Sequence, residues 1–275
     1  MKIKKAVITA AGPGQHHLPL QTLVSPNGET KTAIAFLLDE IFANGMESAA
    51  IVIAPNCERD FSNAVGEHLP KVTFIEQSDP LGYGHAVLCA REFAGVDRIL
   101  LMLGDHLYLT QSDESCLGQF LAVANQVEGS ISAVQPTHES KLPIYGTVGG
   151  QRVSGSNGLY KVSTVLEKPT PTVAEQELII PGLRSGNYLC FFGMHVINPA
   201  VMKHLAESDS TPLLLSPSLN ATAQNENYLA CEIEGIRFNI GEPHGLLRAQ
   251  LGMALAGESR DEVMASIIEL IAMTR

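Results

Sequence analysis

Two stretches of the sequence decide the fold: residues 79–90, DPLGYGHAVLCA, and residues 100–105, LLMLGD. The first is typical of a glycine-rich turn that leads into a helix. The second is typical of a buried strand, and it ends in Gly104-Asp105. In an open α/β sheet, ligands bind at the carboxyl ends of the strands. We therefore expect Asp105 at a ligand-binding rim, although the same residues also fit an ordinary turn and strand.

The flanking sequence repeats this alternation of short apolar runs and helical patterns. We expect strands over 6–10, 49–54, 71–76, 99–103 and 130–135, and helices over 32–44, 84–93 and 114–126. Strands that alternate with helices indicate βαβ units and a parallel sheet. The predicted fold class is α/β, with a Rossmann-like, doubly wound, mostly parallel (mixed) sheet.

The pattern changes after Pro136, where short strands and glycine-rich turns become more frequent. We expect antiparallel strands over 144–150 and 158–162, a strand over 187–196, a hairpin of 229–233 with 236–240, and helices over 199–206, 246–255 and 260–273. No stretch has the composition of a linker. The sequence therefore predicts a single domain over 1–275 with two halves, about 1–135 and 136–275.

Composition excludes several classes of protein. The 275 residues are 45% hydrophobic with a formal net charge of −11, which fits a large core and argues against non-specific nucleic-acid binding. No apolar run reaches the roughly 18 residues of a membrane span. The basic start could open a secretory signal, but the apolar run breaks at Gly12, which favours a first buried strand. Five scattered cysteines without C-x-x-C spacing fit a reducing cytoplasm.

Three short segments contain candidate functional residues. Residues 10–14, AAGPG, follow the first strand, where glycines let the backbone approach a phosphate or a base, or simply form a turn. Asp105 offers the hard oxygen that Mg²⁺ prefers, or caps the next turn. Glu167 and Lys168 could bind sugar hydroxyls and a phosphate, although spacing alone favours an exposed charged pair.

His16 and His17 have no partner with zinc-ligand spacing, so we expect no zinc site.

The order of these segments resembles the sugar-1-phosphate nucleotidylyltransferases, and within them the bacterial UTP–glucose-1-phosphate uridylyltransferases. The matching landmarks span nearly the whole chain: residues 10–14, 77, 80–86, 104–105, 145–146, 158–162, 167–169 and 239–241. The resemblance implies the nucleotide-diphospho-sugar transferase fold, with a nucleotide-binding first half and a sugar-binding second half. It also implies a Mg²⁺-dependent reaction in the cytoplasm. In that reaction a sugar 1-phosphate attacks the α-phosphorus of a nucleoside triphosphate, a nucleotide sugar such as UDP-glucose forms, and pyrophosphate leaves.

Roles follow from the resemblance position by position. It implies that the nucleotide is held by Ala10, Ala11, Gly12, Gly14, Gln77 and Gly82. It implies that the sugar is contacted by Gly146, Glu167 and Asn187, its phosphate by Lys168, and the metal ion by Asp105 and Asn239.

The sequence departs from the family pattern where the phosphates would bind. His16 stands where the family has an arginine that clamps the triphosphate, and a neutral imidazole lacks the charge and the fork of a guanidinium. A lysine-bearing P-K-E-M-L-P segment is missing, and Lys31 aligns with a later family lysine. Asn239 replaces the second metal-binding aspartate.

These departures leave two interpretations open. One is an active nucleotidylyltransferase with a rebuilt phosphate site, in which His16, Lys31 or Lys168 supplies the catalytic charge. The other is a non-catalytic relative that binds a nucleotide or nucleotide sugar and regulates or pairs with an active enzyme. Either way we expect nucleotide and sugar-phosphate ligands and neither nucleic acid nor membrane. A homo-oligomer is among the states that the sequence allows.

Overall fold

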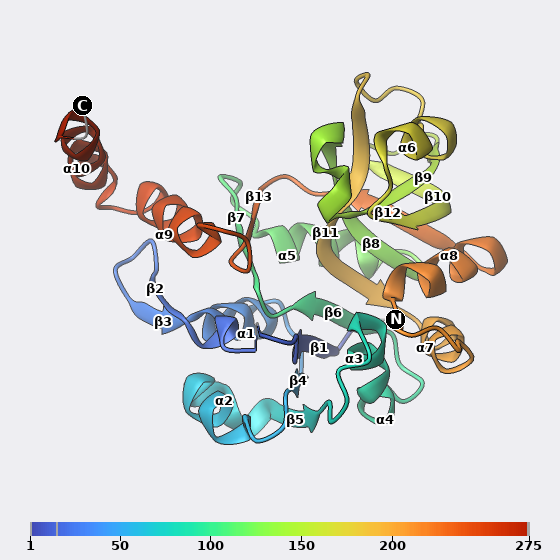
Figure 1. Ribbon diagram of the computed structural model, residues 1–275, viewed down its shortest axis with the longest axis horizontal. Coiled ribbons are helices and arrows are strands. Elements are labelled where there is room, and N and C mark those ends of the chain that lie inside the picture. The colour runs from blue at the N-terminus through green and yellow to red at the C-terminus, as the bar shows by residue number, and fades with distance from the viewer. Residues whose placement is uncertain (1, 15, 274–275) are drawn as a thin grey trace.

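The computed structural model describes residues 2–14 and 16–273. Its centre is a nine-stranded sheet in the order β5-β4-β1-β6-β11-β8-β12-β10-β9 (Figure 1). One edge is a parallel block made of β5 (Val72–Glu76), β4 (Ser48–Ile53), β1 (Lys5–Ala10) and β6 (Ile99–Leu103). Most residues of β1, β4 and β6 are buried, as expected for interior parallel strands covered on both faces. The expected βαβ pattern is therefore present in this block.

The other part of the sheet is largely antiparallel. β11 (Asn187–Ile197) runs antiparallel to β6 and to β8 (Ser130–His138), and β12 (Tyr228–Glu232) lies parallel to β8. β10 (Leu159–Glu167) joins β12 to β9 (Gly146–Arg152). The antiparallel pairing expected for 144–150 and 158–162 is confirmed by β9 and β10, whose short 153–158 connection can join only antiparallel strands. The sheet is mixed, as predicted, but it is not mostly parallel, because β11 runs antiparallel to β6, β8 and β9.

The predicted hairpin of 229–233 with 236–240 is also wrong. β12 is held in the main sheet by β8, whereas β13 (Ile236–Asn239) pairs with β7 (His106–Leu109) in a separate two-stranded sheet. In that pair Asn239 lies opposite His106. The pairing therefore brings residues that are more than a hundred positions apart to one edge of the molecule.

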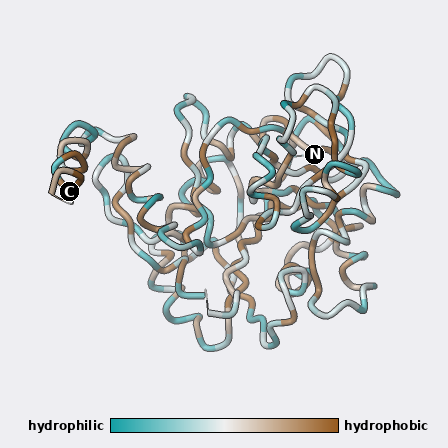
Figure 2. Tube along the Cα trace, turned by 45° about the horizontal axis from the view of Figure 1, so that its top comes forward, coloured by the Kyte–Doolittle hydropathy of each residue, from teal (hydrophilic) through white to brown (hydrophobic). Residues whose placement is uncertain are grey.

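Helices cover both faces of the central sheet and divide its core into two clusters. One face packs against α1 (Ala33–Ala43), α5 (Cys116–Ala124) and α9 (Gly245–Ala256). The other packs against α3 (Tyr83–Cys89), α4 (Arg91–Ala94), α7 (Pro199–Ala206) and α8 (Leu215–Asn225). Figure 2 shows the apolar segments running through the interior of the fold.

The remaining elements lie around this core. They are α2 (Glu58–Ala64), α6 (Pro171–Glu177), the hairpin of β2 (Thr22–Val24) with β3 (Thr30–Thr32), three 3-10 turns at 18–20, 66–71 and 139–144, and α10 (Arg260–Met273). α10 packs against α9 and projects from the body (Figure 1). All five cysteines are free thiols. Among the described residues, no helix combines the length and the apolar character needed to cross a membrane.

Candidate active site

A cavity of about 410 Å³ opens where the parallel block meets the antiparallel part of the sheet. Its walls come from both halves of the chain: the ends of β1 and β6, the turn before α3, the ends of β9 and β10, the middle of β11, and β13. Three groups of predicted residues meet there, and each group lines a different part of the wall.

The first group surrounds the end of β1. Ala10, Ala11 and Gly12 line the cavity, and Gln77 and Gly82 line it from the loop between β5 and α3. The buried Gln77 amide donates from Nε2 to the Gly82 carbonyl at 3.2 Å. This bond ties the start of α3 to the end of β5, so the amide is already oriented before any ligand binds.

Gly82 has a structural reason for being glycine. Its φ is +115°, and a Cβ there would lie 2.5 Å from the Leu213 carbonyl oxygen. The loop before α8 therefore packs directly on this turn. Gly82 both lines the cavity and allows this close approach of two backbones.

The second group offers oxygen ligands. Asp105 and Asn239 both line the cavity, one just before β7 and the other at the end of the paired β13. Asp105 Oδ1 lies 2.7 Å from Nδ1 of His106. Burial raises the pKa of Asp105, but the hydrogen bond and charge of His106 lower it further, so the net pKa lies below its usual value. An ionised carboxylate beside an amide carbonyl is a donor set that fits Mg²⁺, with positions left for phosphate oxygens and water.

The third group lies at the end of β10. Glu167 and Lys168 line the cavity, and the Ser216 hydroxyl donates to Glu167 Oε2. Lys168 has φ +48°, a left-handed conformation that is uncommon for a non-glycine residue and that concentrates at functional sites. Gly146 also lines this wall, and a Cβ there would lie 2.7 Å from the Phe191 ring. The Phe191 ring therefore packs directly on the Gly146 backbone and leaves no room for a side chain at this position of the cavity wall.

Four predicted residues do not line the cavity: Gly14, His16, Lys31 and Asn187. Asn187 starts β11 opposite His138 and donates to the Ser185 carbonyl. His16 lies edge-on to His17, with ring centres 5.8 Å apart. Of the three residues expected to supply catalytic charge, Lys168 alone lines this cavity.

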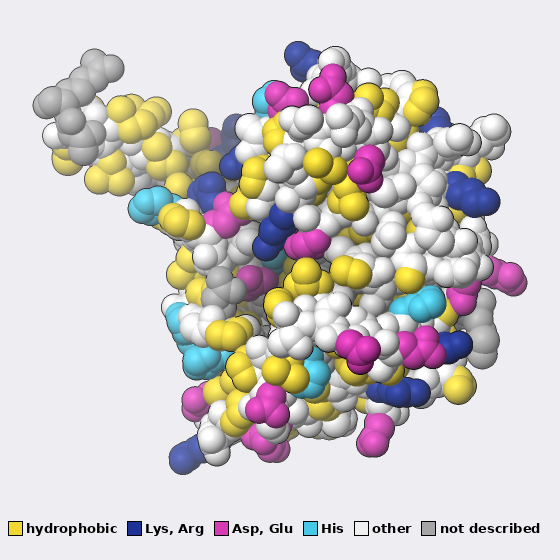
Figure 3. Space-filling model, turned by 45° about the vertical axis from the view of Figure 1, so that its right-hand side comes forward, with side chains coloured by type: hydrophobic (Ala, Val, Ile, Leu, Met, Phe, Trp, Pro, Cys, Tyr) yellow, Lys and Arg dark blue, Asp and Glu magenta, His cyan; other side chains and the backbone are white. Residues whose placement is uncertain are grey.

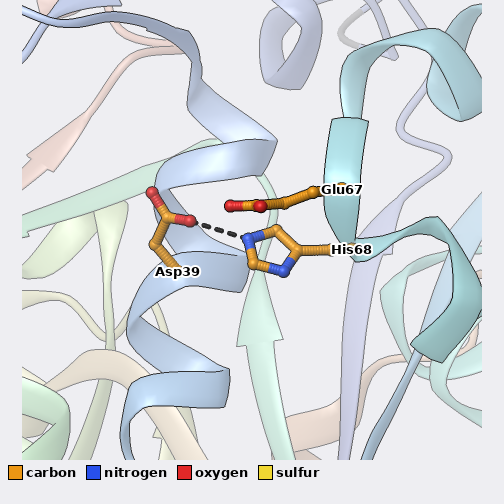
Figure 4. Close-up of side chains that lie close together, drawn as sticks. All are labelled: Asp39, Glu67 and His68. Carbon is orange, nitrogen blue, oxygen red and sulfur yellow. Dashed lines mark hydrogen bonds and ion pairs between the residues drawn. The ribbon is translucent and has the colours of Figure 1, made fainter.

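Lys31 is held elsewhere by carboxylates. Its Nζ lies 2.9 Å from Asp39 and 3.1 Å from Glu29, and hydrogen bonds to these two groups raise its pKa. Asp39 also lies 2.7 Å from His68, beside Glu67 (Figure 4). Lys31 therefore neutralises an acidic cluster outside the cavity, which the alignment of lysines alone could not show.

Arg237 is a cavity residue that the sequence analysis missed. Its guanidinium carbon lies 3.8 Å from the centre of the Tyr145 ring, and its Nη1 donates to the Phe191 carbonyl. Its buried Nε has no acceptor, and no carboxylate pairs with it among the described residues. Because Arg237 lies two residues before Asn239 on β13, both side chains share one face of that strand. The sequence pattern did not indicate Arg237, because it predicts that residues 236–240 pair with residues 229–233 rather than with β7 at the cavity.

The comparisons with known proteins extend over nearly the whole chain. A UTP–glucose-1-phosphate uridylyltransferase of Bacillus subtilis is 28% identical, with 98% of this chain and 96% of that protein covered. One of Streptococcus pneumoniae is 27% identical, with the same coverage of both chains. Over nearly its whole length the chain is therefore similar to sugar-1-phosphate nucleotidylyltransferases. No protein-family model matches the chain.

Solved structures of UDP-glucose pyrophosphorylases superpose on this chain over most of its length. A UDP-glucose pyrophosphorylase from Acinetobacter baumannii superposes with a TM-score of 0.76 at 22% identity, covering 98% of this chain and 99% of that one. A UDP-glucose pyrophosphorylase complexed with UDP-glucose superposes with a TM-score of 0.73 at 22% identity, covering 90% and 97%. The chain therefore shares the α/β architecture of these proteins, with a mixed sheet. At this identity the likeness shows the fold, and the chemistry has to be argued from the residues of this chain.

Proposed function

We propose that the protein transfers a nucleotidyl group, most simply the UMP group of UTP, to a sugar 1-phosphate such as glucose 1-phosphate, within a single nucleotidyltransferase domain. The observation that carries the proposal is the meeting of three groups in one cavity: Gln77 with residues 10–12, Asp105 with Asn239, and Glu167 with Lys168. The curated relatives are named for this reaction, and one structural neighbour is described as bound to UTP.

The arrangement suits a reaction that depends on positioning and on charge. A phosphate oxygen of the sugar 1-phosphate would attack the α-phosphorus of UTP. The new bond joins that oxygen to the α-phosphorus, the bond from the α-phosphorus to the bridging oxygen breaks, and pyrophosphate leaves with the electron pair. Holding both substrates in line supplies much of the rate enhancement.

The residues divide these tasks by chemistry. Residues 10–12 and Gln77 would hold the base, and Glu167 would accept hydrogen bonds from sugar hydroxyls. Asp105 and Asn239 would hold Mg²⁺, which when bound neutralises phosphate charge. Lys168 would contact the sugar phosphate, and Arg237 would supply the second cation of the cavity.

A pyrophosphate-release assay tests the proposal. The wild type is incubated with Mg²⁺ and each pair from a matrix of nucleoside triphosphates and sugar 1-phosphates, and UTP and UDP-glucose binding are measured in parallel by thermal shift. Release with UTP and glucose 1-phosphate supports the proposal. Binding without release with any pair indicates the non-catalytic relative instead, and neither binding nor release overturns both interpretations.

A further inference from the structure

Three buried side chains from three neighbouring strands form a hydrogen-bonded chain beneath the cavity. Ser132 Oγ on β8 lies 2.6 Å from the Tyr228 hydroxyl on β12 and 2.6 Å from Nδ1 of His195 on β11. His195 is 3% exposed, and the other two are fully buried. His195 also lines the cavity, so the chain ends at the ligand-binding space.

Counting donors fixes the direction of this chain. The Tyr228 hydroxyl and the Ser132 hydroxyl make no other hydrogen bond among the described residues. Only one order gives both hydroxyl protons an acceptor: Tyr228 donates to Ser132, and Ser132 donates to Nδ1 of His195. The reverse order would leave the Tyr228 proton buried without an acceptor, which is costly. Nδ1 therefore accepts, and the proton of the neutral ring lies on Nε2.

His195 stays neutral at ordinary pH. Burial lowers its pKa to about 3, and no carboxylate contacts it among the described residues. With Nδ1 taken by Ser132, Nε2–H is the ring donor that a ligand in the cavity can use. A neutral N–H donor of this kind can bind an uncharged acceptor such as a hydroxyl oxygen.

Two more uncharged groups line the same cavity. The Thr9 and Tyr83 hydroxyls are both buried and neighbour each other: burial raises the pKa of Tyr83, and an interaction with the Thr9 hydroxyl partly offsets this. Neither hydroxyl has a further partner among the described residues. The Phe191 ring lies edge-on to His195, with ring centres 4.8 Å apart, and also contacts Gly146 beside Glu167. His195 is therefore connected through one ring to the sugar end of the cavity.

We propose that His195 Nε2–H donates to a hydroxyl oxygen of the sugar, and that the Thr9 and Tyr83 hydroxyls complete an uncharged polar floor that selects the sugar. This inference rests on the proposed function. Its physical basis is that a site with buried hydrogen-bonding groups rejects an analogue that leaves those groups unpaired. A purely apolar floor would discriminate much less.

The tautomer can be measured in the unaltered protein. Long-range ¹H–¹⁵N correlation spectra of histidine-labelled wild type should show the His195 ring neutral and protonated on Nε2 throughout pH 5–8. UDP-glucose should shift the Nε2–H signal, whereas UDP should not. A ring protonated on Nδ1, or one that titrates within this range, overturns the inference, as does a signal that the two ligands shift equally.

Variants test the specificity by calorimetric binding of UDP-glucose and UDP. His195→Phe should reduce the affinity advantage of UDP-glucose over UDP about 3- to 10-fold, the range of one hydrogen bond. His195→Gln should restore much of it, because its amide nitrogen replaces Nε2. Thr9→Val, which keeps the side-chain shape, should lower the same ratio and provides the test if His195→Phe does not fold.

His138→Gln is the matched control, because His138 also pairs with a serine, at 3.0 Å, but on the surface. It should leave the ratio unchanged. Equal losses of UDP and UDP-glucose affinity in His195→Phe and Thr9→Val contradict the inference alone. A wild type that binds neither ligand contradicts the proposed function, and the inference falls with it.

Discussion

At the scale of single residues, Arg237 is the cation that the fold adds to the cavity. We expect Arg237→Gln to weaken glucose 1-phosphate binding about 10- to 100-fold, since a hydrogen bond to a charged group contributes about 1.5–3 kcal/mol. Arg237→Lys should recover part of this, because it keeps the charge but not the planar stack on Tyr145. Calorimetric titration of glucose 1-phosphate measures the effect.

The control for that experiment is Arg152→Gln. Arg152 also lies over a tyrosine ring, that of Tyr160, but does not line the cavity. Its replacement should leave the affinity unchanged. Equal effects of the two substitutions would show that Arg237 acts only through packing and would remove it from the phosphate site.

Asp105 should carry the metal dependence. Its lowered pKa keeps it ionised at neutral pH, so Asp105→Asn removes a charge while nearly preserving shape. We expect UTP to bind wild type more tightly with Mg²⁺ than with a chelator, and this difference to fall at least about tenfold in the variant. Asp113→Asn, an exposed carboxylate, is the control. A variant that keeps the full Mg²⁺ effect would refute the assignment.

Residues that directly follow strands were predictable because the carboxyl ends of strands converge at one rim. Ala11 and Asp105 are examples, and both line the cavity. Lys31 was not predictable, because its position depends on ion pairs with Asp39 and Glu29 that only the fold brings together. Arg237 was missed because its strand pairs with a partner more than a hundred residues away.

At the scale of elements, β11 joins the two parts of the sheet. It pairs with β6, β8 and β9, and its ladder with β8 is interrupted between Phe191 and His195, where Gly193 has φ +95°. The sequence predicted β11 nearly to its ends but not its partners. An apolar run defines a strand, whereas the direction and order of pairing depend on contacts with distant segments.

The buried His195 in β11 makes stability depend on pH. Its pKa falls from about 6.5 unfolded to about 3 folded, so between these values the unfolded chain binds the extra proton. The neutral His195 ring therefore makes its full contribution to the free energy of unfolding above pH 6.5, and this contribution is lost as the pH falls toward 3. From pH 7.5 to 5 this amounts to about 2 kcal/mol.

Urea unfolding at both pH values measures this term as the difference between wild type and His195→Gln. The variant should lose about 2 kcal/mol less on acidification than the wild type, whereas His138→Gln, which changes an exposed ring, should behave as the wild type does. Parallel pH profiles for wild type and His195→Gln would mean that His195 is not held neutral in the folded state.

At the scale of the whole molecule, the body and the protruding α10 differ in how they are stabilised. The sheet passes through both halves of the chain, and the cavity lies where they join. In α10, all of whose residues the structure describes, none is buried. Its apolar side chains include Met264 at 40% and Ile268 at 61% exposure. Figure 3 shows hydrophobic side chains along this projecting segment. The body should therefore fold and bind ligands without this helix.

Ending the chain after Gly257 tests this division. Gly257 itself is needed, because it packs against the Pro26 backbone, whereas the residues beyond it contribute little buried apolar area. We expect the shortened protein to keep its thermal midpoint within about 2 °C, since about 1 kcal/mol shifts a domain of this size by roughly that much. Its UTP affinity should also stay within about twofold of the full chain, which calorimetry measures. Two results together would contradict this expectation. The thermal midpoint would fall by much more than about 2 °C, and sedimentation would show a loss of mass larger than the mass of the deleted residues. These results would mean that the exposed side of α10 is covered by a second chain in solution and contributes to stability there.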